Sequence, residues 1–142
     1  MRRSHALIHE LALECGYATA SIRERIYARE QSSSCPATAG VFLYTAAPDS
    51  EGTLGGLVAL AEPTSFGRLL GAALDRSRLC SSDPMCASHR PALTEQTLHH
   101  AACHACLFLP ETSCERGNRY LDRNVIVATL AGVGTEYPFR TS

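Results

Sequence analysis

The stretch Cys103-His104-Ala105-Cys106 is a C-x-x-C motif, whose spacing lets two thiolates bind one zinc ion at about 2.3 Å. A second pair lies upstream in Cys80-Ser81-Ser82-Asp83-Pro84-Met85-Cys86, where a proline-containing turn can bring both sulfur atoms together. Residues 87–102 separate the pairs, which together supply the four ligands of a closed tetrahedral site. We therefore predict one structural zinc ion bound by Cys80, Cys86, Cys103 and Cys106.

A fifth cysteine, Cys114, competes for the same four places, and four histidines lie in the same stretch: His89, His99, His100 and His104. Because a local pair of ligands loses less conformational entropy on binding, we prefer the two pairs and keep Cys114 as the reserve ligand. Cysteines can also be small buried hydrophobic residues. The gathering of so many within residues 80–114 favours a zinc-binding cluster over that alternative.

Length and composition indicate one folded domain over residues 1–142, with a frayed tail at about residues 133–142. The chain is 45% hydrophobic and 19% charged, as globular proteins are, and its net charge of -1 gives no bulk attraction to nucleic acid. His9 and Glu10 interrupt any signal-peptide core, and no apolar run is long enough for a bilayer. We expect a cytoplasmic protein without a membrane partner, and in that compartment seven cysteines favour metal over disulfides.

The periodicity of apolar residues predicts an α+β fold, an α-rich single domain with a short strand or hairpin and one structural zinc site. The expected helices span residues 4–15, 19–28, 63–78, 94–107 and 121–130. In the second of these, Ile22 and Ile26 would share one helical face. Residues 40–45 suit a buried strand, residues 31–39 a loop, and residues 54–60 either a second strand or the start of a helix.

We expect no catalytic activity. A catalytic zinc site needs an open coordination position and a general base, and no residue is singled out as that base. The chain has no lysine and no G-x-x-x-x-G-K-[ST] phosphate loop, which excludes ATP hydrolysis of that type. A thiol redox enzyme using Cys103 and Cys106 is the alternative, but it would place the motif at a helix N-terminus, whereas residues 98–102 look helical before it.

Three longer segments, residues 51–57, 80–86 and 101–115, followed by Asn118 and by Leu121-Asp122-Arg123, resemble the MrfA-type zinc-binding domain attached to bacterial helicases. The likeness is greatest to the C-terminal region of DrmB-like proteins from DISARM antiphage systems, and it extends from the first expected helix to Val127. The resemblance implies that the family's four zinc ligands map onto Cys80, Cys86, Cys103 and Cys106, with Cys114 outside the set.

The same resemblance implies a zinc-stabilised, non-catalytic interaction module of a helicase-associated antiphage defence complex. Its partner would be a helicase subunit of the DrmA type or a longer DrmB-like chain, acting in the recognition of invading DNA. A truncated fragment that is inactive without its partner segments is a further alternative.

Three arginines following the cysteine cluster are candidates for direct DNA contact. Arg116, Arg119 and Arg123 have spacings of three and four, which would place them on one helical face beside the zinc site. Glu115 and Asp122 lie near enough to pair with them, so a salt-bridged, solvated face is the competing interpretation.

Overall fold

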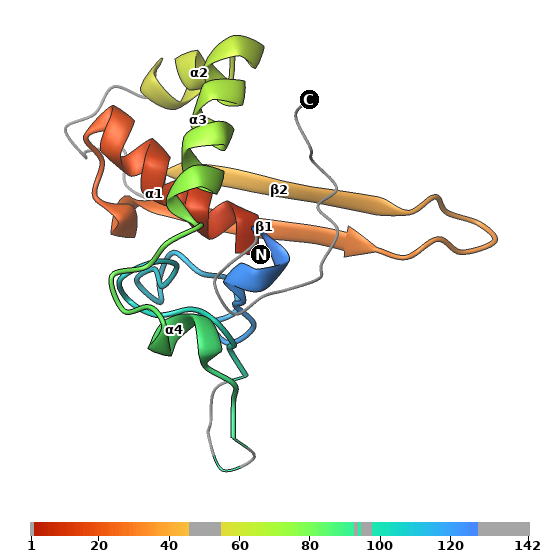
Figure 1. Cartoon of the computed structure of the whole chain (residues 1–142). Helices are drawn as coiled ribbons and strands as arrows, with labels where there is room; N and C mark the ends of the chain where they lie inside the picture. Colours follow the sequence, from red (N-terminus) through yellow and green to blue (C-terminus); the bar gives the residue numbers. More distant parts are fainter. Residues whose placement is uncertain (1, 46–54, 93, 95–97, 128–142) are drawn as a thin grey trace.

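The computed structural model describes residues 2–45, 55–92, 94 and 98–127 (Figure 1). Its helices are α1 (Arg2–Cys15), α2 (Gly55–Leu60), α3 (Pro63–Arg76) and α4 (Met85–Ser88), its strands are β1 (Ile22–Arg29) and β2 (Thr38–Thr45), and short 3₁₀ helices occur as η1 (Thr19–Ser21) and η2 (Arg123–Val125). The fold is therefore α+β with one antiparallel hairpin, as predicted. Across the described ranges, no helix is both long enough and apolar enough to cross a membrane.

Strand β1 corrects the expected helix at residues 19–28. Ile22 and Glu24 are buried whereas Arg23 and Arg25 are exposed, which is the period of two of a strand. Ile22 and Ile26 are four residues apart, a spacing that places them on one side of either a helix or a strand. Pairing with β2 makes this segment a strand.

Strand β2 confirms the predicted strand at residues 40–45 but begins two residues earlier, inside the stretch expected to be a loop. Its register pairs Ile22 with Thr45 and Arg29 with Thr38. The prediction of a buried strand is wrong, because Val41 and Phe42 are exposed. The hairpin extends well beyond the helices in Figure 1, and none of the described helices lies beside its distal half.

Helices α1 and α3 confirm two predicted helices, and α2 settles residues 54–60 in favour of a helix. The predicted helix at residues 94–107 is wrong where it can be compared, because residues 98–107 form turns. The predicted helix at residues 121–130 is likewise reduced to η2, and its last three residues lie outside the described part. The single domain over residues 1–142 remains a prediction, and its expected frayed tail also lies outside the described residues.

Among the described residues, two clusters of buried side chains form the core, and α1 contributes to both. The first joins α1 to α3 and to the start of β1: Leu7, Ile8, Leu11, Ala12, Tyr17, Ile22, Leu69 and Leu109. The second joins α1 and α3 to the C-terminal loops: Ala6, Ala73, Ala102, Leu107, Leu121, Ile126 and Val127. Burial of each such leucine or isoleucine stabilises the fold by about 1.5–3 kcal/mol. Because α1 has residues in both clusters, it connects the hairpin to the C-terminal loops.

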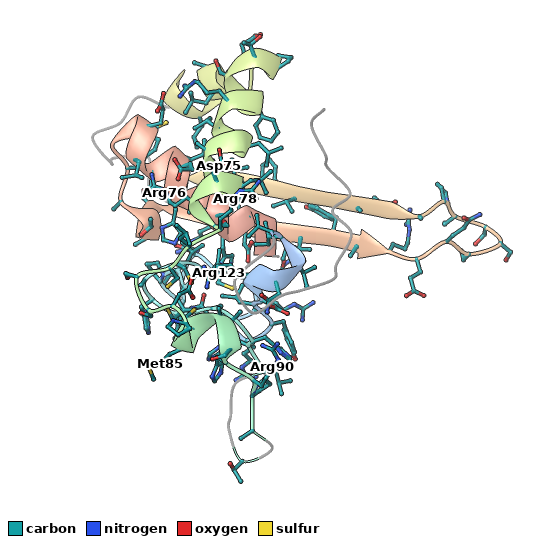
Figure 2. The ribbon with its side chains drawn as sticks, viewed as in Figure 1. Asp75, Arg76, Arg78, Met85, Arg90 and Arg123 are labelled. Atoms are coloured by element: carbon teal, nitrogen blue, oxygen red, sulfur yellow. The ribbon has the colours of Figure 1, made fainter. Side chains whose placement is uncertain are left out.

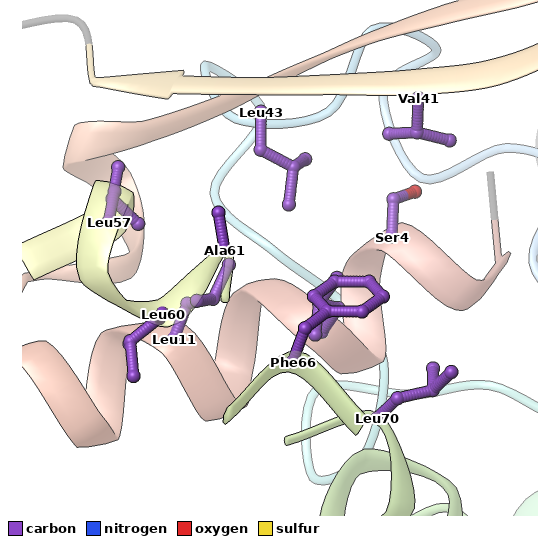
Figure 3. A pocket seen from close by; sticks show the side chains of 10 residues that line it. Ser4, Leu11, Val41, Leu43, Leu57, Leu60, Ala61, Phe66 and Leu70 are labelled. Atoms are coloured by element: carbon purple, nitrogen blue, oxygen red, sulfur yellow. The ribbon is translucent and has the colours of Figure 1, made fainter. Parts of the chain in front are cut away.

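An apolar cavity of about 430 Å³ lies between the hairpin and the helices. Figure 3 shows Val41 and Leu43 of β2 on one side of it and Phe66 of α3 on the other, with Leu11 of α1 and Leu60 of α2 completing the wall. The face of the hairpin that carries Val41 and Leu43 is therefore its inner face.

Candidate metal centre

The sulfur atoms of Cys80, Cys86, Cys103 and Cys106 converge at one point beside α4, and all of them lie within 4.8 Å of one another. The Sγ–Sγ distances are 3.5 Å for Cys80 and Cys103, 3.8 Å for Cys86 and Cys106, and 3.8 Å for Cys103 and Cys106. A disulfide needs about 2.05 Å. In a regular tetrahedron with metal–sulfur bonds of about 2.3 Å, the sulfur atoms are about 3.8 Å apart. These three distances lie close to that value and the other sulfur pairs are within 4.8 Å, so the four thiols could surround one tetrahedral zinc ion.

The first cysteine loop, residues 80–86, is organised by the carboxylate of Asp83. This carboxylate accepts hydrogen bonds from the amide of Cys80 at 2.8 Å and from the amide of Ala87 at 3.1 Å. The amide of Ser82 donates to Cys80 Sγ at 3.4 Å, and the carbonyl of Ser82 accepts from the amide of Cys86 at 2.9 Å. The predicted turn thus directs both sulfur atoms to the same side.

The second cysteine loop, residues 103–106, is a tight turn rather than part of a helix. The amide of Cys103 donates to Cys106 Sγ at 3.3 Å, and the amides of Cys106 and Leu107 donate to the carbonyl of Cys103 at 3.2 and 3.1 Å. Amides that point at a sulfur atom stabilise its thiolate, the form that binds metal. This local turn explains why the helical periodicity of the segment was misleading.

The electrostatics of the cluster call for a cation. Burial, followed by the charge of Cys106, raises the pKa of the Cys86 thiol. Burial likewise raises the pKa of Cys106 to about 12, and the neighbouring thiolates add to this effect. Burial opposes the shift at Cys103, but hydrogen bonds from the Ala105 amide and from Cys80 lower its pKa. Four adjacent thiolates would repel one another, and a bound divalent ion removes that penalty. The donor set therefore fits zinc.

Arg123 contacts the first cysteine loop through Asp83 and is 0% exposed. Its guanidinium forms an ion pair with Asp83, which is itself buried. Burial opposes the effect, but Arg123 lowers the pKa of Asp83 and keeps it ionised. Arg123 Nη1 also donates to the carbonyl of Ser77 at 3.4 Å. Figure 2 shows Arg123 in the interior between α3 and α4.

This burial corrects the predicted arginine face. Residues 115–120 form turns and residues 121–122 are irregular, so Arg116, Arg119 and Arg123 do not share one side of a helix. Arg116 and Arg119 are exposed, whereas Arg123 is out of reach of a ligand. The sequence predicts Glu115 and Asp122 as the acidic partners of these arginines. That prediction misses Asp83, although Asp83 lies inside the quoted cysteine motif.

Cys114 lies in a different buried group, with His5 and Glu24, whose ligand atoms are also within 4.8 Å of one another. His5 Nδ1 donates to the carbonyl of Leu107 at 2.8 Å, and Nε2 faces Glu24 Oε1 at 3.2 Å. Burial would lower the pKa of His5, but hydrogen bonds with Cys114 and Glu24 raise it to about 9. A protonated His5 forms an ion pair with Glu24. These contacts join α1 and β1 to the residue that follows the second cysteine loop, Leu107.

Further hydrogen bonds hold Glu24 and Cys114 in place. Ser4 and the amide of Glu115 donate to the carboxylate of Glu24, and the amide of Asn118 donates to Cys114 Sγ at 3.2 Å. Three of the four histidines near the cysteine cluster make ring contacts: His89 stacks on His99, and His99 and His104 contact Phe108 edge-on.

Comparison with known proteins agrees with this geometry. The family model of the MrfA Zn-binding domain matches residues 3–107, a range that contains all four clustered cysteines and ends before Cys114. The DISARM protein DrmB of Bacillus paralicheniformis (strain ATCC 9945a / NCIMB 11709 / CD-2) is 44% identical over 127 residues, which are 89% of this chain and 21% of that protein. The chain thus spans about a fifth of the length of this relative.

Proposed function

The chain belongs to the MrfA zinc-binding domain family, and from this membership we propose that it is a zinc-stabilised, non-catalytic interaction module of a DISARM-like antiphage defence complex. The convergence of four sulfur atoms at tetrahedral spacing carries the proposal. Cys80, Cys86, Cys103 and Cys106 would hold one structural zinc ion. The ion would neutralise the thiolates and cross-link two loops that contain little regular secondary structure.

Elemental analysis of purified protein tests the zinc assignment. We expect about one zinc per chain, and the Cys103→Ser variant is expected to lose it. Cys35→Ser is the matched control, because Cys35 lies at the end of the hairpin away from the cluster. Cys114→Ser is expected to keep its zinc as well, since Cys114 belongs to the group with His5 and Glu24. A zinc-free, folded wild-type protein with free thiols would overturn the proposal.

The partner we propose is a longer DrmB-like chain, which in turn would act with a helicase subunit of the DrmA type. The stretch that matches this chain is only 21% of the DrmB relative, so in that protein it adjoins a much longer part of the polypeptide. The apolar cavity between β2 and α3 supports such an interface, because exposed side chains of Val41 and Phe66 lie at it. Reducing conditions in the cytoplasm, where we place the protein, would keep the thiols available for zinc.

Co-purification tests this interface. The longer chain, supplied as a separate tagged protein, is expected to retain the wild-type module and to lose a Phe66→Glu variant. Leu13→Glu is the control, because Leu13 is exposed on α1 and does not line the cavity. Equal retention of both variants would show that the cavity is not the interface.

A thiol redox role for Cys103 and Cys106 is the second candidate, and the lowered pKa of Cys103 favours it. The two neighbouring sulfur atoms of Cys80 and Cys86 favour zinc instead. Titration of thiols with and without a chelator separates the two functions. Structural zinc predicts thiols that react only after chelation, whereas a redox pair predicts reactive thiols in both samples and a reversible disulfide.

The DNA contact proposed from the arginines is reduced to Arg116 and Arg119, which remain exposed in the turns after Cys114. If they contact phosphates, replacing both by alanine should weaken salt-sensitive DNA binding. Unchanged binding in a filter assay would remove them from the proposal.

A further inference from the structure

The outer face of the hairpin, opposite the cavity, carries only arginine, aromatic and small side chains. Alternation along the strands places Arg23, Arg25, Tyr27 and Arg29 of β1 on this face, together with Thr38, Gly40, Phe42 and Tyr44 of β2. The register pairs Arg23 with Tyr44 and Arg25 with Phe42. Arg23 and Arg25 are therefore each paired across the strands with an aromatic residue.

The aromatic rings of this face are open to solvent. The exposed fractions are 54% for Tyr27, 56% for Phe42 and 38% for Tyr44. Phe42 and Tyr44 stack on each other with ring centroids 5.6 Å apart and planes inclined by 19°. Side chains two apart on one strand thus present neighbouring, nearly parallel rings to solvent.

The charge of the face is positive. Glu24, the acidic residue within β1, is buried on the inner face, and Glu30 follows Arg29 at the end of the strand. Arg25 is paired with Glu115 at 3.5 Å, but its side chain is 61% exposed and such pairs are weak. Arg29 donates to Thr38 across the strands at 3.2 Å, which confirms that paired positions share this face. The net charge of the chain is -1, so this basic strip is local.

We propose that the outer face of the hairpin binds single-stranded nucleic acid, with unpaired bases stacked on Phe42 and Tyr44 and phosphates paired with the neighbouring arginines. Each nucleotide of a strand carries one flat base and one negatively charged phosphate. The outer face offers aromatic rings on which bases can stack and arginines that can pair with phosphates. Paired bases in a duplex leave no ring face free for stacking, so the aromatic row favours an unpaired strand. This inference deepens the DNA contact in the proposed function but does not rest on the zinc assignment.

Fluorescence anisotropy of the zinc-loaded full chain tests the proposal, with labelled oligothymidylate as the probe. Phe42→Ala and Tyr44→Ala are each expected to weaken binding by at least about fivefold, because stacking on one ring contributes about 1–3 kcal/mol. Phe42→Tyr keeps a ring and should bind like wild type. Phe66→Ala is the matched control, since Phe66 is an exposed aromatic residue that lines the cavity and does not belong to the outer face. The oligothymidylate annealed to its complement should bind weakly and with no dependence on Phe42.

The arginines are tested through the salt dependence of the same binding. Each phosphate contact contributes about 0.7 to the slope of log K against log salt for a single strand, so Arg23→Ala and Arg25→Ala should each reduce it by about that amount. Arg78→Ala is the control, because Arg78 is an exposed arginine that follows α3 and does not belong to the outer face of the hairpin.

Zinc content and circular dichroism of every variant keep folding apart from binding. If Phe42→Ala proves unfolded, Phe42→Leu takes its place, because leucine keeps an apolar side chain and removes only the ring. Absence of oligothymidylate binding by the wild-type protein, or equal binding by the aromatic variants, overturns the proposal while leaving the zinc centre intact. Variants that still bind the strand but no longer associate with a longer DrmB-like chain would identify the face as a protein interface and overturn it as well.

Discussion

Arg123→Met is expected to damage the zinc loop without touching a cysteine. The guanidinium of Arg123 and the carboxylate of Asp83 are almost fully buried, with side-chain exposures of 0% and 6%. The same carboxylate receives the amides of Cys80 and Ala87, so it positions both ends of the first cysteine loop. Methionine fills a similar volume but leaves the Asp83 charge buried and unpaired.

Leaving one member of a buried ion pair unpaired costs about 3–5 kcal/mol. Small domains have about 5–15 kcal/mol of stability in total, so Arg123→Met should unfold at a much lower urea concentration. The loss of an outer-shell hydrogen bond typically weakens metal binding about 10- to 100-fold, so zinc should also be lost to a weaker competing chelator. Urea titration at saturating zinc measures the first effect, and chelator competition measures the second.

Arg78→Met is the matched control, because Arg78 forms an exposed pair with Asp75 that should contribute about 0–1 kcal/mol. In the double variant Asp83→Asn/Arg123→Met, neither charge remains buried, so its loss of stability should be smaller than the sum of the two single losses by about 1–3 kcal/mol. If Arg123→Met behaved like Arg78→Met in both assays, the support of the loop by this ion pair would be refuted.

Other groups give further predictions. The pKa of His5 is raised to about 9 in the fold, so its stabilising contribution is complete below about pH 6.5 and is lost as pH rises through about 9; urea unfolding across that window should show a decline that His5→Asn flattens. Asn118 Oδ1 accepts from the Leu109 amide and Nδ2 donates to the Leu109 carbonyl. Asn118→Ala should therefore reduce the free energy of unfolding by about 2–4 kcal/mol in the same assay. A strong chelator should lower the melting temperature and expose four additional thiols to titration, and restored zinc should reverse both.

Local patterns predicted much of the helical part of this fold. Leu7, Ile8 and Leu11 recur at helical spacing, and α1 buries them as expected. The helix predicted from Thr19 to Ala28 is wrong because isoleucines four residues apart fit both a helix and a strand. Pairing with β2 decides for the strand, and that pairing is a tertiary effect. The helix predicted at residues 94–107 is wrong over residues 98–107 for another reason. Amide hydrogen bonds to the cysteines fold this segment into turns, and that requirement outweighs its helical periodicity.

The candidate site was predictable where its residues are close in sequence. Each cysteine pair is local, and the spacing of each pair already indicated metal. The partners that support the site come from far along the chain: Arg123 reaches Asp83 across forty residues, and His5 reaches the carbonyl of Leu107 from the first helix. No local pattern marks such contacts. Arg123 was singled out for its charge, yet its burial gives that charge an internal partner instead of DNA.

X-ray absorption at the zinc edge of the purified protein tests the central claim most directly. If Cys80, Cys86, Cys103 and Cys106 hold the ion, the spectrum should fit four sulfur neighbours at about 2.3 Å, with no nitrogen or oxygen neighbour. A first shell containing nitrogen or oxygen at about 2.0–2.2 Å, or a protein without zinc, would contradict the four-cysteine centre.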